Sequence, residues 1–219
     1  MTSLEEQHAP ERTNWRSLAF KTGTGAVVGA LGAAGMMQLI DSGALGTLDR
    51  SREIAALLGL LYLITAGIVA FGLVSPRAGS RLLNVEDAEE IREMRPMLAW
   101  SAVGTSALAG VLFLAALAAP AGPVPAMIAL VAIIFLFLLA WYTTHRQSAY
   151  ADELMLAVSR EATSAAFYIS VMVGGGWALL AHLGFLAGPQ PLDWLTMFAG
   201  FMLLGAFAIT VRRGLIRRT

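Results

Sequence analysis

The longest uncharged stretch of the sequence covers residues 96–145 and contains no Asp, Glu, Lys or Arg. The same holds for the stretches 22–40, 54–76, 162–192 and 194–211. A lipid hydrocarbon core about 30 Å thick is crossed by a helix of about 20 apolar residues, so these stretches predict membrane-spanning helices. Their hydrophobicity is continuous, whereas the strands of a transmembrane barrel alternate between apolar and polar residues. The sequence therefore predicts an all-α, polytopic membrane protein.

Composition narrows the function classes. Of the 219 residues, 57% are hydrophobic and 14% are charged, against about 25% charged residues in a typical soluble domain. These values exclude an ordinary soluble domain, a disordered chain and a nucleic-acid-binding protein. The chain contains no cysteine, which excludes disulfides, thiolate metal sites and a cysteine nucleophile.

Prolines divide the longest stretch into two helices. Three of them stand in the segment 119–125, where they remove backbone donors and favour a turn. A similar segment, 187–191, closes the stretch 162–192. We therefore expect one transmembrane domain, 19–211, between an N-terminal tail, 1–18, and a basic C-terminal tail, 212–219. Its six spanning helices are expected at 19–40, 53–75, 97–118, 125–143, 164–186 and 193–211.

The basic residues predict the orientation. Thirteen of the fifteen Lys and Arg residues fall on the side that holds both termini, and only Arg50 and Arg52 fall on the other. The positive-inside rule then places both termini in the cytoplasm of a bacterial inner membrane. The bacterial origin is suggested by composition, because the chain has one Lys and fourteen Arg. A cleaved signal peptide ending near residue 35 is the disfavoured alternative, since a signal n-region is normally short and basic.

Two turns suggest an internal repeat. The turns Ala121–Pro125 and Ala187–Pro191 are nearly identical at an offset of 66, and the helices before them begin Ala99-Trp100 and Ala166-Phe167. This pattern predicts tandem helical hairpins inserted the same way, with a third copy at the N-terminus less well supported. The alternative is chance similarity among abundant Ala, Gly and Pro.

Small residues predict helix-packing faces. Gly25-x-x-x-Gly29 is the spacing that lets helix backbones approach closely, and Gly175 lies within three consecutive glycines. We expect such faces to line the inside of the bundle, and the Leu- and Phe-rich returning helices to face lipid.

Two cytoplasmic segments, 84–95 and 151–162, carry apolar residues three to four apart and are expected to form short amphipathic helices at the membrane surface. Their acidic residues are a candidate surface for docking a partner: Glu86, Asp87, Glu90, Asp152 and Glu153. The alternative is a solvated helix face with ion pairs such as Glu89 with Arg92.

His182 is the one ionisable side chain expected inside a span. A histidine at this depth suits solute binding or proton transfer, but it also suits a single interhelical hydrogen bond. No catalytic motif is recognisable. We therefore expect no enzyme activity, no cofactor and no metal site.

Three hypotheses remain at this point. The favoured one is an accessory or scaffold membrane subunit that forms a homo-oligomer or joins a membrane complex. The alternative is a transporter or channel for a small solute or ion with a site near His182. The third, an intramembrane enzyme, lacks a catalytic set.

Overall fold

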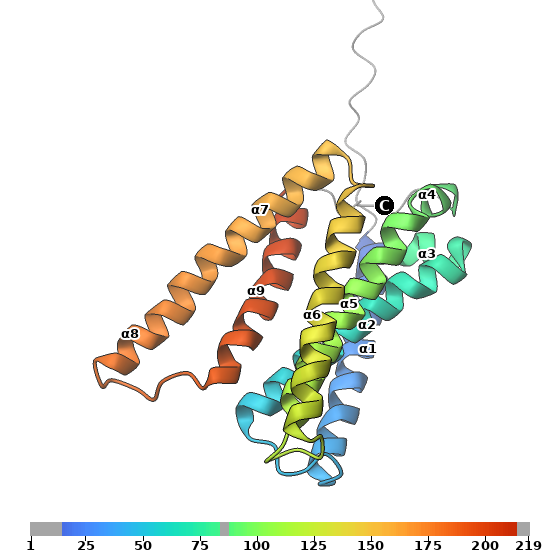
Figure 1. Ribbon diagram of the computed structural model, residues 1–219. Helices are drawn as coiled ribbons and strands as arrows, with labels where there is room; N and C mark the ends of the chain where they lie inside the picture. The colour runs from blue at the N-terminus through green and yellow to red at the C-terminus, as the bar shows by residue number, and fades with distance from the viewer. Residues whose placement is uncertain (1–14, 84–87, 214–219) are drawn as a thin grey trace, which may run out of the picture.

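The structure is a computed structural model that describes residues 15–83 and 88–213, with side chains described for 25–79 and 89–213. Its elements are helical, as the sequence predicts (Figure 1). The long helices are α1 (Trp15–Asp41), α2 (Arg50–Val74), α5 (Arg95–Leu117), α6 (Ala126–Ser148), α7 (Glu153–Ile169) and α9 (Pro191–Arg212). The shorter elements are α3 (Pro76–Leu83), α4 (Ala88–Glu93), the π-helix η1 (Ser170–Gly175) and α8 (Gly176–His182).

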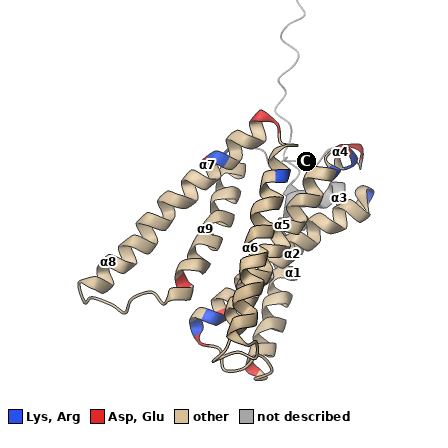
Figure 2. Ribbon diagram, in the orientation of Figure 1, with Lys and Arg blue, Asp and Glu red and all other residues tan. Residues whose placement is uncertain are grey.

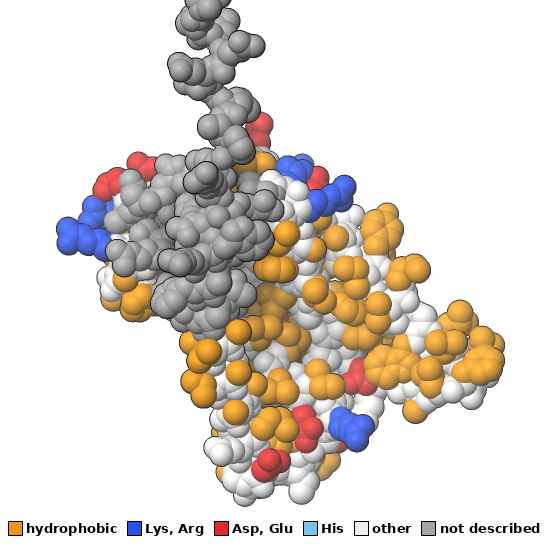
Figure 3. Space-filling model, turned by 180° about the vertical axis from the view of Figure 1, so that it is seen from behind, with side chains coloured by type: hydrophobic (Ala, Val, Ile, Leu, Met, Phe, Trp, Pro, Cys, Tyr) orange, Lys and Arg blue, Asp and Glu red, His pale blue; other side chains and the backbone are white. Residues whose placement is uncertain are grey.

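Five helical stretches within the described residues are long and apolar enough to cross a membrane. They are α2, α5, α6, the continuous helix Glu153–His182 and α9, with mean hydropathy between 1.5 and 2.5. The apolar part of α1, Gly25–Asp41, is shorter. These findings confirm an all-α, multi-pass membrane protein. Figure 3 shows the matching surface, with hydrophobic side chains over the middle of the molecule and charged ones gathered near its two ends.

The fifth span differs from the prediction. A helix was expected over 164–186, preceded by a separate amphipathic helix over 151–162. Instead one continuous helix runs from Glu153 to His182, and 183–190 form the following turn. The Asp152 side chain caps this helix by accepting from the backbone N–H of Met155 at 2.6 Å. Since no proline stands between 153 and 182, nothing breaks the helix where it leaves the predicted surface segment.

Successive long helices form hairpins. α2 contacts α1, α6 packs along α5, and α9 packs along α7. The turns 42–49, 118–125 and 183–190 lie at one end of the molecule, which we call the turn end (Figure 1). The helices α3 and α4, the start of α7 and the end of α9 lie at the other end. Figure 2 shows charged residues gathered at these two ends.

The centre of the molecule is α2, which packs against α5, α9, α1 and α3. Its buried residues are small apart from Tyr62, and Gly59 lies directly against Ala109 and Leu112 of α5. Close approach of the two backbones explains this position. The expectation that returning helices face lipid is therefore wrong for α2. It holds for α6, which exposes Phe135 and Leu138.

The short helices α3 and α4 connect α2 to α5 at the end opposite the turns (Figure 1). α3 was not predicted. Pro76 starts it, and Gly79 lies so close to Gly72 that a side chain would clash with the backbone there. In α4, Ile91 is only 1% exposed, and the predicted ion pair between Glu89 and Arg92 is present at 2.7 Å. The start of the predicted segment 84–95, including Glu86 and Asp87, lies outside the described residues.

Candidate functional site

A groove of about 710 Å³ opens between the two later hairpins, at the end of the molecule opposite the turns. We call it the inter-hairpin groove. Its walls come from α4, the start of α5, the end of α6, the start of α7 and the end of α9. Its volume is in the range of about 300–1,000 Å³ that is usual for ligand pockets.

Two residues of the predicted docking surface lie on this groove. Glu90 of α4 and Asp152 before α7 both line it, although they are 62 residues apart in the sequence. No Lys or Arg is among its lining residues within the described chain. Glu153, by contrast, is an exposed residue of the first turn of α7 outside the lining. The groove therefore has a negative edge.

Methionines form much of its apolar wall. Met94 directly precedes α5, and Met97 lies in its first turn. Met155 comes from α7 and Met202 from α9. Methionine is unbranched and polarisable, so it adapts to irregular partners and is common at surfaces that bind several peptides. The sequence analysis missed this cluster because its members come from three separate parts of the chain.

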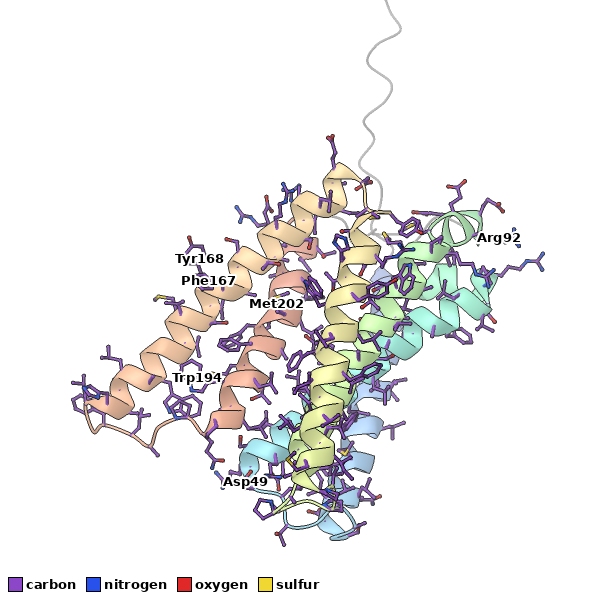
Figure 4. The ribbon with its side chains drawn as sticks, viewed as in Figure 1. Asp49, Arg92, Phe167, Tyr168, Trp194 and Met202 are labelled. Carbon is purple, nitrogen blue, oxygen red and sulfur yellow. The ribbon has the colours of Figure 1, made fainter. Side chains whose placement is uncertain are left out.

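A second groove of about 460 Å³ continues from the first along α7 and α9. The two share Thr163 and Met202. Figure 4 shows Trp194 in the space between α8 and α9, where its ring lies against Gly174. Phe198 of α9 also lines this groove. Together the two grooves form one long, mostly apolar depression that runs from the charged end of the molecule into its apolar middle.

The second groove exists because α8 diverges from α9. Among the described residues the main packing partner of α8 is η1, and α8 points away from the start of α9 (Figure 1). The π-helix η1 covers the first two of the three consecutive glycines. π-helical turns are often found at functional sites. The three consecutive glycines are visible in the sequence, but the π-helix was not predicted.

His182 is the last residue of α8, and its side chain is exposed. The described residues contain no group of three or more His, Asp or Glu side chains arranged to hold a metal ion. His182 is not among the described residues that line the inter-hairpin groove.

The predicted packing glycines do not make the close contacts within this chain. A Cβ at Gly25, Gly29 or Gly175 would meet nothing within 4 Å. Close approaches occur instead at other glycines, where a Cβ would stand within 3.3 Å of a neighbouring helix: Gly59, Gly104, Gly174 and Gly205. Among the described residues nothing packs against the Gly25–Gly29 face, and the expectation that this face lines the inside of a bundle stays a prediction.

Polar contacts at the turn end are structural. The Arg52 guanidinium donates through Nη1 to the carbonyl oxygens of Ala116 and Ala118, at 2.9 and 2.6 Å. These carbonyls belong to the end of α5, where helix acceptors lack intrahelical partners. At the start of α2, the Asp49 side chain caps the helix by accepting from the backbone N–H of Arg52 at 3.0 Å.

One ion pair joins α7 and α9 near the inter-hairpin groove. The Arg213 guanidinium donates to the Glu161 carboxylate through both Nε and Nη2. This hydrogen bonding raises the pKa of Arg213 above its ordinary value. Glu161 is thereby engaged in fixing the hairpin rather than in forming the edge of the groove.

Comparison with known proteins gives no relative from which a role can be transferred: no family, curated protein or solved structure matches the chain.

Proposed function

We propose that the chain is a non-catalytic subunit of a bacterial inner membrane, with six spanning helices and both termini in the cytoplasm, that binds a partner protein in the inter-hairpin groove. The observation that carries this proposal is the groove itself, which combines four methionines with two acidic residues at one end of the bundle. The described interior offers few polar groups to support a reaction instead, since the buried polar side chains are Ser51, Thr143 and Thr196.

The proposed topology includes α1 as the sixth span. α1 has 27 residues, which corresponds to about 40 Å at 1.5 Å per residue and is long enough to cross a hydrocarbon core. The three turns at one end of the molecule support hairpins inserted in the same direction. The excess of Arg at the opposite end supports placing that end in the cytoplasm.

The chemistry of the groove indicates the kind of partner. An apolar wall fits the apolar face of a helix, and adaptable methionines accept its side chains. The negative edge formed by Glu90 and Asp152 favours a partner that carries Lys or Arg at that level. Basic residues are common at the cytoplasmic ends of spanning helices. The proposed occupant is therefore a partner helix that leaves the membrane with basic residues at its cytoplasmic end.

Site-specific cross-linking tests this proposal, because the natural chain has no cysteine. Ser148→Cys and Ser159→Cys place a photoreactive maleimide on the groove lining, and Ser42→Cys places the same reagent at the turn end. In membranes of the native cell, the two groove variants should give one discrete protein adduct. Ser42→Cys should not give it.

A matched blocking variant makes the test sharper. Ala206→Trp adds bulk to an exposed position on the groove lining and should abolish the adduct. Ala126→Trp adds the same bulk to an exposed position at the start of α6 and should leave the adduct intact. If the adduct persists with Ala206→Trp, or if Ser42→Cys gives it too, the groove is not the docking site.

The π-helix within the fifth span favours a second candidate function, transport of a small solute or ion. A π-helical turn with three glycines provides a hinge in a membrane helix, and His182 stands one short helix beyond it. Flux into proteoliposomes should then change with Gly175→Leu and with His182→Ala. Flux that neither variant alters would reject this site.

A further inference from the structure

A second hollow at the end of the molecule opposite the turns has the opposite charge. This arginine cleft, of about 690 Å³, lies where α2 ends and α5 begins, and it is lined by Leu73, Val74, Pro76, Ile91, Arg92 and Arg95. Its floor is apolar, and its charged lining residues are both arginines. The described lining of the inter-hairpin groove, by contrast, has two acids and no base.

The fold holds the two arginines at the rim. Ile91 is 1% exposed and anchors α4, which holds the backbone of the next residue, Arg92, at the rim. Arg95 is the first residue of α5. Both stand at the level where the apolar helix α2 ends, at Val74. For a helix that crosses a membrane, this level corresponds to the boundary between hydrocarbon and headgroups.

One acidic contact is described at this rim, and it is on the solvent side. Glu89 accepts from Nη1 of Arg92 at 2.7 Å, which uses one of the five N–H donors of the guanidinium. That pair is well exposed, with 58% of the Arg92 side chain accessible. Figure 4 shows Arg92 on the outer side of α4, away from the bundle. Glu90 faces the inter-hairpin groove instead.

An exposed apolar track leads to the cleft along α2. Ile68, Phe71 and Val74 are spaced three residues apart and so share one face of the helix. They are 39%, 47% and 83% exposed. The track runs from the middle of α2 to the rim that carries the arginines. This combination is complementary to an anionic phospholipid, whose acyl chains lie in the membrane and whose anionic group lies at the interface.

We propose that the arginine cleft binds an anionic phospholipid, with Arg92 and Arg95 donating to the phosphodiester and an acyl chain lying along Ile68, Phe71 and Val74. Guanidinium groups recognise phosphate oxygens through charge-assisted, often paired, hydrogen bonds. Basic pockets between membrane helices are known sites for anionic headgroups. The proposal requires that α2 crosses the membrane, and it is independent of any partner in the inter-hairpin groove.

Thermal unfolding of the delipidated full chain in mild detergent tests the proposal. Three additives separate the sources of the phosphate: phosphatidylglycerol, phosphatidylcholine and free glycerol phosphate. Phosphatidylglycerol should raise the unfolding temperature, and the other two should not. The double variant Arg92→Gln/Arg95→Gln should lose this shift, with an affinity for phosphatidylglycerol lower by about 30-fold for two lost arginines. Arg50→Gln, which removes an exposed arginine at the turn end, is the control and should keep the shift.

A second variant tests the acyl track without touching the charges. Val74→Asn changes a side chain that is 83% exposed, so folding should not depend on it. It should reduce the phosphatidylglycerol retained by the purified protein, as counted by native mass spectrometry. A shift that survives in Arg92→Gln/Arg95→Gln, or retention unchanged by Val74→Asn, would overturn the proposal. An equal shift with glycerol phosphate would indicate a free phosphate site and would also overturn the lipid assignment.

Discussion

The hydroxyl of Ser51 donates a hydrogen bond to Oδ1 of Asp193 at 2.5 Å and so joins the first turns of α2 and α9. The other carboxylate oxygen, Oδ2, accepts from the backbone N–H of Gln190 at 2.7 Å, which is the N-cap of α9. Asp193 therefore both caps its own helix and fixes it to the central helix. This explains why a carboxylate stands at the edge of an otherwise apolar span.

Asp193→Ala should destabilise the protein more than Ser51→Ala. The aspartate variant loses a capping interaction, about 0.5–2 kcal/mol, as well as the bond to Ser51, about 0.5–1.5 kcal/mol. The serine variant loses only the latter. Denaturant midpoints in mild detergent measure the order, with Asp41→Ala, an exposed residue at the end of α1, as control. Equal losses in all three variants would contradict the role of Asp193.

Arg52→Gln should destabilise the turn end, whereas Arg50→Gln should not. Arg52 donates to two carbonyls at the end of α5, and hydrogen bonds that involve a charged group contribute about 1.5–3 kcal/mol. Arg50 is an exposed residue at the start of α2. The free energy of unfolding of the two variants in the same detergent measures the difference. Losses of equal size would show that the carbonyl contacts of Arg52 carry no stability.

Gly205→Ala should loosen the last hairpin, because a Cβ there would stand 2.6 Å from the carbonyl oxygen of Ala162 in α7. Forcing the helices apart costs about 1–3 kcal/mol. Gly175→Ala is the matched control: its Cβ would meet nothing within 4 Å, and alanine favours a helix over glycine by about 1 kcal/mol. Unfolding midpoints should fall for the first variant and stay or rise for the second. The reverse order would contradict the packing of α7 on α9.

The sequence predicts where the helices lie along the chain better than it predicts which helices pack together. Uncharged stretches and proline-rich turns locate five of the six long helices to within about five residues, because the bilayer imposes length and apolarity on every span. The exception is the fifth span, which begins at Glu153 and not near 164. The central position of α2 could not be predicted in this way. Consecutive residues such as Ala56, Leu57 and Leu58 point to different sides of the helix and are all apolar, and hydrophobicity alone then does not distinguish a protein-facing side from a lipid-facing one.

The candidate sites were only partly visible in the sequence. Glu90 and Asp152 were singled out as acids of two cytoplasmic segments, but their place on one groove depends on how two hairpins pack. The arginine cleft was missed for the same reason, because Val74 and Arg95 come together through α3 and α4. The π-helix depends on a shift of backbone hydrogen bonds, which hydropathy does not record.

Two serines offer a direct test of the proposed orientation. Ser42 follows α1 at the turn end, and Ser148 ends α6 at the opposite end. Both are exposed, and each hydroxyl donates to a backbone carbonyl three residues earlier, at 2.7 and 2.8 Å. Replacing either by cysteine therefore removes the same local bond, and the rest of the chain contains no thiol.

In intact bacterial cells, a membrane-impermeant maleimide should label Ser42→Cys and should leave Ser148→Cys unlabelled. After the membranes are dissolved in a denaturing detergent, which also removes any partner from the groove, both should be labelled to the same extent, and this controls for the reactivity of each thiol. The physical reason is the excess of Arg at the end that carries Ser148, which the positive-inside rule assigns to the cytoplasm. Labelling of Ser148→Cys alone in intact cells would invert the topology. Labelling of both in intact cells would show that the turn between α1 and α2 and the end of α6 are on the same side, and would reject three hairpins inserted in one direction.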